Sequence, residues 1–433
     1  GKDMHGKIAL IRRGTYTFYS KIQNAEAAGA AAAIIFNNVP GLLFAQAGDP
    51  GTVTVPAFTI NQDVGLSLVS QLQGGPVTVE YSGTAQSPYQ YDLMLPNPGQ
   101  IGADQTYDIS SKNTAEIDAA YYADTPDQLG LDVDDALRPW TTFVFGVGRS
   151  LIHPMQRTEW VSADPDTSWW HLTWENYPFN GEFDGVPTSY QPLTKMSENW
   201  FDQAARPGMP DGLTGWEDSG APAYRQGDQF TMYVFPYVDQ AQHLGFGTGG
   251  DTADTKLYQG SQLLAESTYP IGTFPAVPGD ATYRMVSDEQ RSAPWWTYST
   301  DISTTWTFHS ATVPSGRALL PLLQVDYRLG KLDLLNRAPG ASAYTFTLAI
   351  GHQTGVSGPP ISSASAWASF DDGATWSQIE LSRLDDVRWL AVVPQPKSAP
   401  SSGAVSLRVA ATDAGGNSID QTVLRAYGLQ PSG

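Results

Sequence analysis

Residues 6–38, GKIALIRRGTYTFYSKIQNAEAAGAAAAIIFNN, decide the fold of the first part of the chain. The stretch begins with a short apolar run that stops at Arg12-Arg13-Gly14, which predicts a strand. The period then changes to that of a helix with one apolar face, formed by Phe18, Ile22, Ala25 and Gly29. Gly29 can end this helix. The near-continuous apolar run at 33–36 then predicts a strand that is buried on both faces.

The same strand and helix pattern recurs once, between residues 55 and 75. Residues 55–60 predict a strand, and Asn61 is placed to act as the N-cap of a second helix. The buried face of that helix is expected to consist of Val64, Leu68 and Leu72, and Gly74-Gly75 marks its end. The first part of the chain is therefore predicted to be a small α/β domain.

The segments GKIALIRRG, NAEAAGAAA, IIFNN and VPAFTI occur in this order and resemble the protease-associated (PA) domain, a small α/β module. The resemblance covers residues 1–83 and implies a domain that is incomplete at its N-terminus, with its opening strands before Gly1. It implies a non-catalytic module that sits beside or within proteases and helps to govern substrate access or protein contacts. We therefore expect a groove or loop surface for polypeptide, with binding candidates at Arg12, Arg13 and Tyr16. Tyr16 stands where many relatives carry a cysteine.

The composition excludes several classes of partner and site. The chain has 433 residues, with 24 Lys plus Arg against 44 Asp plus Glu and a formal net charge of −20. Such a surface repels phosphate backbones and anionic lipid, so we expect no nucleic-acid partner. No apolar run approaches the ~18 residues of a transmembrane helix, so we expect no membrane insertion. Cysteine is absent, which excludes disulfides, thiolate zinc sites and cysteine nucleophiles. An acidic, cysteine-free chain rich in Gly, Pro, Trp and Tyr is common among secreted bacterial proteins, and we expect an extracellular location.

After Gly75 the helical periodicity ends, and short β-like runs separated by Gly, Pro, Asn and Asp follow. We predict a Trp-rich β-sandwich-like domain at 84–206, a β-sandwich at 207–315 and an immunoglobulin-like β-sandwich with seven strands at 316–433. Strand candidates in the first of these include residues 105–109, 116–122, 142–147 and 168–174. The run at 142–147, TFVFGV, is of the kind that fills a sandwich core. The predicted fold class is multidomain and mostly β, with an N-terminal α/β PA domain followed by immunoglobulin/fibronectin-like β-sandwiches.

A second resemblance extends over nearly the whole chain. After the PA-like segments come YDLMLP, RTEWVS, TWTFHS, SFDDGATW and ATDAGGN, in that order. This order is similar to the region downstream of the catalytic domain in secreted actinobacterial subtilisin-like (subtilase family) serine proteases. The resemblance implies a chain whose catalytic domain lies in a missing upstream part.

The residues of a subtilisin-like active site are not found in this sequence. Such an enzyme needs a Ser, a His and an Asp, each in a local context that aims its side chain. The serine block Gly-Thr-Ser-Met-Ala is missing, and none of the 6 His is followed by Gly-Thr. Asp218-Ser219-Gly220 imitates the aspartate block but follows Gly215-Trp216-Glu217 in place of an apolar strand. We therefore expect no catalytic residue and no enzymatic activity in this chain as given.

Residues 369–376, SFDDGATW, fit the Asp-box pattern S-x-D-x-G-x-T-W. Turn chemistry accounts for each position, because carboxylate and hydroxyl groups hold a tight turn and the glycine takes a backbone angle that a Cβ disfavours. We interpret Ser369, Asp371, Gly373 and Trp376 as structural turn residues, with sugar contact as the alternative.

Carboxylates cluster at Asp132, Asp134 and Asp135, which are the calcium candidates of this chain. Calcium takes roughly six to eight oxygen ligands, and such groups could supply part of a shell. Solvated loops in an acidic chain are the alternative. No EF-hand loop occurs, and the scattered histidines give no zinc motif. We expect no cofactor other than calcium.

Seven of the 13 Trp lie between Trp140 and Trp216, in and near the run WWHLTW. Trp169 and Trp174 are candidates for a platform that stacks on sugar rings, and core packing is the alternative, because burial of an aromatic side chain contributes roughly 1.5 to 3 kcal/mol.

The sequence thus predicts the PA and β-domain region of a secreted protease, which positions polypeptide substrates or partners near the protease catalytic domain and stabilises the enzyme. Two alternatives stay open at this point: a chain that binds carbohydrate or cell-wall glycans, and a self-associating surface or fibre protein.

Overall fold

The chain forms two compact units, Gly1–Thr84 and Ala85–Gly433. They are described here from a computed structural model, which covers residues 3–430 except 42, 44, 46–52, 85, 98, 211–222, 341–342 and 397–402. No helix in the part of the chain that the structure describes is long and apolar enough to cross a membrane.

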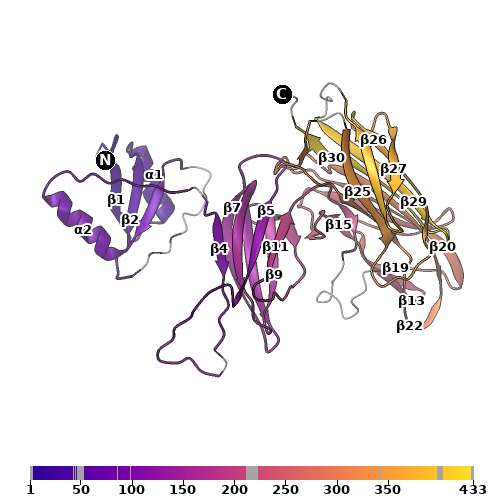
Figure 1. Ribbon diagram of the computed structural model, residues 1–433, viewed down its shortest axis with the longest axis horizontal. Coiled ribbons are helices and arrows are strands. Elements are labelled where there is room, and N and C mark those ends of the chain that lie inside the picture. The colour runs from indigo at the N-terminus through magenta and orange to yellow at the C-terminus, as the bar shows by residue number, and fades with distance from the viewer. Residues whose placement is uncertain are drawn as a thin grey trace. The chain divides into compact units, whose positions relative to one another are not determined.

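The first unit is a three-stranded parallel sheet with two helices, as Figure 1 shows in its dark colours. The sheet has the order β1-β2-β3, and its elements are β1 (Ile8–Arg12), α1 (Phe18–Ala27), β2 (Ala32–Phe36), β3 (Ala57–Ile60) and α2 (Gln62–Gln73). Every residue of β2 is buried, as its continuous apolar run predicts. The side chain of Thr17 accepts the N–H of Ser20 and so caps α1. The predicted strand, helix and strand of this unit are confirmed.

The face that α2 turns to the sheet differs from the predicted one. Val64 and Leu72 are 47% and 48% exposed, so their assignment to a buried face was wrong. The buried residue of this helix is Gly65, where an added Cβ would lie 2.2 Å from the Phe36 ring. The orientation of α2 is therefore set by the close approach of the helix to β2 at Gly65. The apolar periodicity of the helix does not predict this contact.

Among the described residues, the second unit contains four β-sheets. One four-stranded sheet has the order β11-β5-β8-β4, with β4 Tyr89–Asp92, β5 Thr114–Tyr121, β8 Met155–Ser162 and β11 Lys195–Trp200. A seven-stranded sheet has the order β12-β15-β16-β10-β9-β6-β7, with β6 Gln128–Arg138, β7 Thr141–His153, β9 Ser168–Asn176, β10 Asn180–Asp184, β12 Arg206–Gly208, β15 Phe235–Val238 and β16 Leu244–Gly245. A second four-stranded sheet has the order β19-β14-β13-β22, with β13 Ala223–Gly227, β14 Gln229–Tyr233, β19 Ile271–Pro275 and β22 Val313–Leu319.

The largest sheet has 12 strands, in the order β18-β17-β20-β21-β30-β29-β26-β27-β28-β25-β23, with β24 paired to β30. Its strands are β17 Thr252–Gln259, β18 Gln262–Ser267, β20 Asp280–Gln290, β21 Asp301–Ala311, β23 Leu323–Arg328, β24 Arg337–Ala338, β25 Ala343–His352, β26 Ile361–Ser369, β27 Ser377–Arg383, β28 Arg388–Pro394, β29 Ala404–Asp413 and β30 Ser418–Leu429. Buried residues alternate along β25 and β29, and Phe346 and Leu407 share one core, as expected for a sandwich. The fold is mostly β, with an α/β unit at its start.

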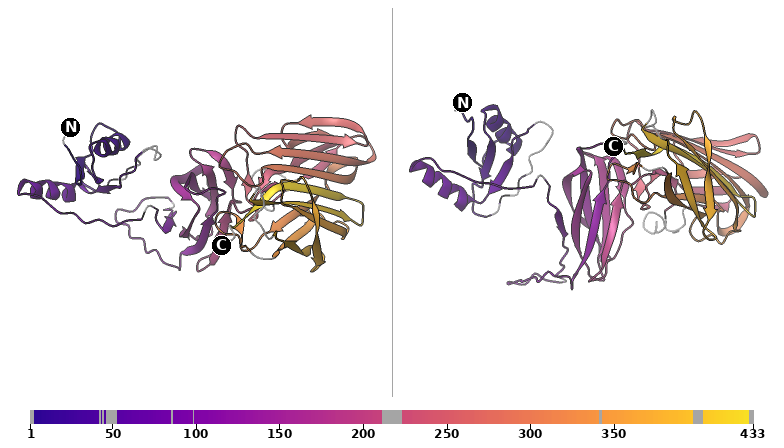
Figure 2. Two further views of the ribbon diagram at one scale, coloured as in Figure 1. Left: turned by 90° about the horizontal axis from the view of Figure 1, so that it is seen from above. Right: turned by 45° about the horizontal axis from the view of Figure 1, so that its top comes forward.

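The core of the second unit is continuous across the boundaries predicted at 206 and 315. Trp200, Trp306 and Leu407 belong to one cluster of buried side chains, and β21 pairs with β30. Figure 2 shows the strands of this unit from two further directions. The division of residues 84–433 into three domains stays a prediction.

Two expectations about strands were wrong. Residues 105–109 form no strand, because the Asn113 side chain holds a turn there by accepting from Ser110 N at 2.8 Å and donating to Asp108 O at 2.7 Å. The run TFVFGV does lie in β7, but Phe143 and Val147 are 64% and 61% exposed. In the described part of the chain β7 is the last strand of its sheet and pairs with β6.

Candidate functional site

The edge of β1 that faces away from β2 can accept a ligand. The carbonyl of Lys7 accepts the N–H of Ala31 at 2.8 Å, and the N–H of Arg13 donates to the Phe36 carbonyl at 2.8 Å. The odd-numbered residues therefore turn their peptide groups toward β2. Because the direction alternates along a strand, Leu10 and its even-numbered neighbours point theirs away from β2. No strand of the described part of the chain pairs with that edge.

A groove of about 580 Å³ runs along this edge. Its first wall comes from β1 and the loop that follows: Ala9, Leu10, Ile11, Arg12, Gly14, Thr15 and Tyr16. Its second wall comes from Lys21, Asn24 and Ala25 of α1 and from the C-cap residue Ala28, which follow at i, i+3, i+4 and i+7 and so lie on one side of the helix. Because residues from both faces of β1 contribute, the groove follows the strand edge itself.

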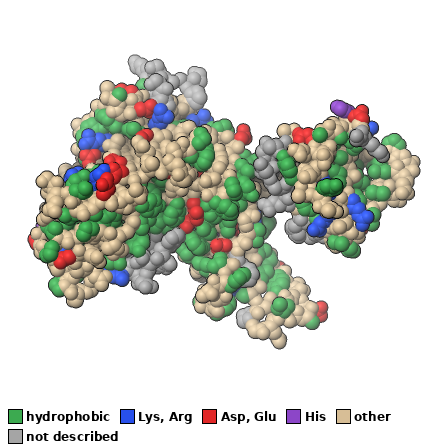
Figure 3. All heavy atoms as spheres, turned by 180° about the vertical axis from the view of Figure 1, so that it is seen from behind, with side chains coloured by type: hydrophobic (Ala, Val, Ile, Leu, Met, Phe, Trp, Pro, Cys, Tyr) green, Lys and Arg blue, Asp and Glu red, His purple; other side chains and the backbone are tan. Residues whose placement is uncertain are grey.

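The groove combines an apolar floor with positive charge. Arg12 and Lys21 line it, and no Asp or Glu is among its lining residues. Lys21 donates to the Tyr16 carbonyl, and its ammonium lies 5.8 Å from the centre of the Tyr16 ring, so it fixes the loop above the groove. Tyr16 itself is 79% exposed. Figure 3 shows hydrophobic and basic side chains side by side on one face of this unit.

The structure brings together two of the three binding residues predicted in this unit. Arg12 and Tyr16 both line the groove, whereas Arg13 does not. The guanidinium of Arg13 donates to Asn37 Oδ1 at 3.2 Å, on the side of β2. The sequence reasoning missed Lys21, although its place four residues after the N-cap Thr17 put it beside the loop.

Trp169 and Trp174, predicted as a sugar platform, are 3% and 7% exposed, so the platform reading was wrong. The Trp169 indole donates to the Ser162 carbonyl at 2.8 Å, and that of Trp174 donates to Glu182 Oε2 at 3.1 Å. Their strand β9 lies between β6 and β10, and side chains on both of its faces are covered. A sugar ring has no access to either indole.

An exposed aromatic cluster lies elsewhere in the second unit. Tyr91 stacks on Trp160 with ring centres 4.9 Å apart and an angle of 16°, and Tyr89 lies 5.7 Å from the same indole. Tyr89 and Tyr91 are 55% and 57% exposed. Sequence reasoning missed the two tyrosines, whose i, i+2 spacing in YQYD places them on one strand face.

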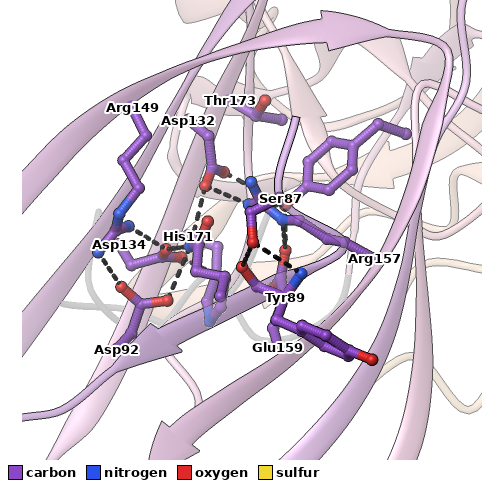
Figure 4. Close-up of polar contacts among 12 residues, drawn as sticks. Ser87, Tyr89, Asp92, Asp132, Asp134, Arg149, Arg157, Glu159, His171 and Thr173 are labelled. Carbon is purple, nitrogen blue, oxygen red and sulfur yellow. Dashed lines mark hydrogen bonds and ion pairs between the residues drawn. The ribbon is translucent and has the colours of Figure 1, made fainter. Parts of the chain in front are cut away.

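The calcium candidates on β6 do not converge on one point. Asp132 and Asp134 are 1% and 3% exposed, while Asp135, on the opposite strand face, is partly exposed. Figure 4 shows the inward pair meeting cations and not an open site. Asp132 binds Arg157 at 2.6 Å, and Asp134 binds His171 at 2.6 Å and Arg149 at 3.3 Å. No group of three His, Asp or Glu side chains within the described ranges could hold a metal ion.

The buried charges of this network perturb one another. Burial, reinforced by Asp132, raises the pKa of Asp134 well above its usual value. Burial alone lowers the pKa of His171, but the carboxylates of Asp134 and Glu198 outweigh it and hold that pKa well above its usual value. His153, buried next to the network, has its pKa lowered by burial to about 4. Burial therefore leaves His153 uncharged at neutral pH, whereas the neighbouring carboxylates favour the charged form of His171.

The Asp-box residues form the expected turn between β26 and β27. Ser369 Oγ donates to Asp371 Oδ1 at 2.7 Å and accepts the N–H of Gly373 at 2.9 Å, and Asp371 Oδ1 also accepts the N–H of Thr375 at 2.8 Å. Gly373 has φ +84°, and Trp376 is partly buried against this turn. These contacts account for the four residues by turn geometry.

Comparisons with known proteins bear on the first unit. Residues 1–68 match the family model described as "PA domain". The Minor extracellular protease Vpr of Bacillus subtilis is 36% identical over 84 residues, which are 19% of this chain and 10% of that protein. Aminopeptidase YwaD of the same organism is 46% identical over 70 residues, 16% of this chain and 15% of that protein. A probable leucine aminopeptidase 2 of Arthroderma benhamiae is 37% identical over 78 residues, 18% of this chain and 16% of that protein.

Solved structures align over more of the chain. The three N-terminal domains of the bacteriophage RB49 Highly Immunogenic Outer Capsid protein (Hoc) are 5% identical, with a TM-score of 0.19, over 74% of this chain and 99% of that one. The chicken CNTN1 FN1–FN3 domains are 10% identical, with a TM-score of 0.13, over 71% and 99%. At these TM-scores neither likeness bears on the function. These three curated proteins share 10% to 16% of their own length with this chain, and the N-terminal unit of this chain is a PA domain.

Proposed function

We propose that this chain is the accessory region of an extracellular subtilisin-like serine protease, in which the PA domain holds an extended polypeptide along the open edge of β1. The β-sheet unit stabilises the assembly and positions the bound polypeptide for a catalytic domain outside this chain. An extracellular location fits the absence of cysteine and the likeness to an extracellular protease.

The groove along β1 is the observation that supports this proposal. An extended polypeptide can pair with the free peptide groups of the even-numbered residues, because such bonds need no particular side chain. Ala25 and Ala28 leave room beside the strand for alternate side chains of the bound segment. Arg12 and Lys21 favour a segment that carries carboxylates, since no carboxylate of the protein lines the groove.

The non-catalytic character of the chain rests on its sequence. The serine and histidine blocks of a subtilisin-like site do not occur, and no Gly-x-Ser-x-Gly elbow replaces them. The segment Asp218-Ser219-Gly220, which resembles the aspartate block of such a site, lies outside the described residues. Incubation of the full chain with casein should therefore leave casein uncut, and cleavage that survives repurification of the chain would contradict the proposal.

The binding test compares two neighbouring arginines. Fluorescently labelled, dephosphorylated casein serves as a largely unfolded acidic polypeptide, and its polarisation is measured against the full chain. Arg12→Glu reverses a charge inside the groove and should weaken binding about tenfold at low salt. Arg13→Glu makes the same change one residue later, outside the groove, and should weaken it less than about twofold. Equal effects of the two variants, or no binding by the parent chain, would refute the groove as the polypeptide site.

Glycan contact is a second candidate, supported by the exposed pair Tyr89 and Tyr91 beside Trp160. Retention of the full chain on insoluble polysaccharides should be lost in the double variant Tyr89→Ala/Tyr91→Ala. Tyr107→Ala, which removes a tyrosine that is 46% exposed elsewhere in the same unit, should leave retention intact. If no polysaccharide retains the parent chain, this candidate is removed.

A further inference from the structure

A cleft of about 790 Å³ lies within the second unit, beside an end strand of one of its sheets. One wall of the cleft is β11, the end strand of a four-stranded sheet. Other walls come from β23 and β25, which pair at one end of the largest sheet, and from the turn at residues 240–243. The volume falls in the range of ligand-binding sites, roughly 300 to 1,000 Å³.

The outer edge of β11 carries peptide groups that no other strand uses. The carbonyl of Thr194 accepts the N–H of Glu116 at 2.8 Å, and the carbonyl of Trp200 points to the same side, so the even-numbered residues turn their peptide groups toward β5. Because the direction alternates along a strand, Ser197 and Asn199 turn theirs away from β5. Both residues line the cleft, and no strand of the described part of the chain pairs with this edge.

The rest of the lining leaves room for the side chains of a bound segment. Ala349 and Gly351 line the cleft from β25 with little or no side chain. Met196 and Val387 are 36% and 49% exposed and add apolar surface to the same lining. An extended peptide needs main-chain partners along a strand edge and space for its alternate side chains. The cleft offers both.

The carboxylates among the lining residues are buried or paired. Glu198 lies 3.7 Å from His243 Nε2, and its side chain is 15% exposed. Asp202 is 3% exposed, and Asp326 binds Arg206. These groups therefore give the cleft little accessible negative charge.

The accessible charge of the cleft is positive. Arg328, at the end of β23, and Lys331, in the turn that follows, both line the cleft and are exposed. Neither side chain forms an ion pair or a hydrogen bond within the described ranges. The chain as a whole has a formal net charge of −20, so an acidic ligand is repelled by most of the surface and attracted at such a local pair of cations.

We propose that this cleft binds an extended acidic peptide, whose main chain adds to the edge of β11 at Ser197 and Asn199 and whose carboxylates meet Arg328 and Lys331. The main-chain bonds hold the segment along the strand, and the two cations select its charge. The cleft gives the β-sheet unit a polypeptide site of its own, which does not depend on the groove of the PA domain.

Fluorescence polarisation of the labelled peptide Val-Glu-Val-Glu-Val-Glu-amide tests the proposal at low salt. The full chain is used with Arg12→Glu, which places a repulsive charge in the groove of the first unit, and this chain should still bind the peptide. If the parent chain binds and Arg12→Glu abolishes all binding, the peptide belongs to that groove and the proposal is overturned. Methylation of the peptide nitrogens removes the main-chain donors of the probe and keeps its charges, so it should weaken binding at least about fivefold.

Further variants of the Arg12→Glu chain locate the binding. Arg328→Gln/Lys331→Gln should weaken the acidic peptide at least about tenfold. The control Lys112→Gln/Arg317→Gln removes the same charge from two other exposed sites of the second unit and should weaken it less than about twofold. Equal effects of the two double variants would overturn the proposal.

Amide hydrogen exchange reports the main-chain contact without a further substitution. The N–H groups of Ser197 and Asn199 should become protected when the acidic peptide is added. Absence of binding up to about 1 mM peptide, full binding of the methylated peptide, or binding without protection of these two amides would each contradict strand addition at β11.

Discussion

Replacement of Arg157 by Met tests what holds the Trp-rich sandwich together. This guanidinium is 6% exposed and donates to Asp132 at 2.6 Å, to Glu159 at 2.6 Å and to the Tyr121 hydroxyl at 2.9 Å. Met keeps most of the volume but leaves two carboxylates buried without their cation. Removal of one partner of a buried ion pair costs about 3 to 5 kcal/mol, which is roughly two to four powers of ten in the folding equilibrium.

The loss should depend on pH in a definite direction. Burial raises the pKa of Glu159, and Arg157→Met removes Arg157, the strongest of the groups that oppose this rise. A carboxyl whose pKa is higher in the folded than in the unfolded state binds protons on folding, so its contribution to stability falls as pH rises through the folded pKa. The free energy lost in Arg157→Met should therefore be largest at pH 7 and above and should shrink toward pH 5.

Tryptophan fluorescence during urea unfolding of the full chain is a suitable assay, because all 13 Trp lie after residue 84 and the signal reports the second unit. The control is Arg408→Met, which breaks a two-bond pair with Asp420, at 2.9 and 2.6 Å, whose partners are 42% and 40% exposed. An exposed pair contributes below about 1 kcal/mol. The reasoning would be refuted if Arg157→Met lowered the free energy of unfolding by no more than Arg408→Met does, or if its loss of stability did not depend on pH.

Three further predictions concern stability, each measured by unfolding of the full chain. Because burial lowers the pKa of His153 from its usual 6.5 to about 4, the unfolded chain binds an extra proton between these values, and stability present above pH 6.5 is lost toward pH 4. His153→Gln should remove roughly 3 kcal/mol of that acid sensitivity, and an unchanged pH dependence in this variant would contradict the assignment. Gly373→Ala should lower the free energy of unfolding by about 1 to 2 kcal/mol, because φ is +84° and the new Cβ would lie 3.0 Å from Leu424. The control Gly249→Ala, whose Cβ would have nothing within 4 Å, should lower it by about 0.5 kcal/mol or less. Equal losses in the two variants would contradict the account of the turn. Trp169→Ala should lower the free energy of unfolding by about 3 to 5 kcal/mol, whereas Trp140→Ala, at a site that is 56% exposed, should lower it by about 0.5 kcal/mol. A nearly unchanged stability in Trp169→Ala would mean that this side chain is not part of the hydrophobic core.

Local patterns carried the sequence prediction furthest where a strand is continuously apolar. The run that forms β2 correctly indicated burial on both faces of that strand. The PA domain was recognisable because its strand, helix and strand signals follow one another within a short stretch. Each of these signals lies within a single element.

Features that depend on distant residues escaped the same reasoning. The buried face of α2 is set by the contact of Gly65 with Phe36, across two elements. Asp132 and Asp134 share a strand face by their spacing, but the cations Arg149 and Arg157 reach them from other strands. The groove of the first unit forms only where β1 and α1 lie side by side, which no pattern within either element reports. Sequence patterns predicted most strands, but only the three-dimensional structure shows which residues of different strands form a site together.

Amide hydrogen exchange along β1 tests the polypeptide groove most directly. Exchange at Leu10 and Arg12, whose N–H groups point to the open edge, is measured with and without saturating dephosphorylated casein. Strand addition predicts that these amides become protected while those of β3 stay unchanged. Casein binding without added protection of Leu10 and Arg12 would contradict the account.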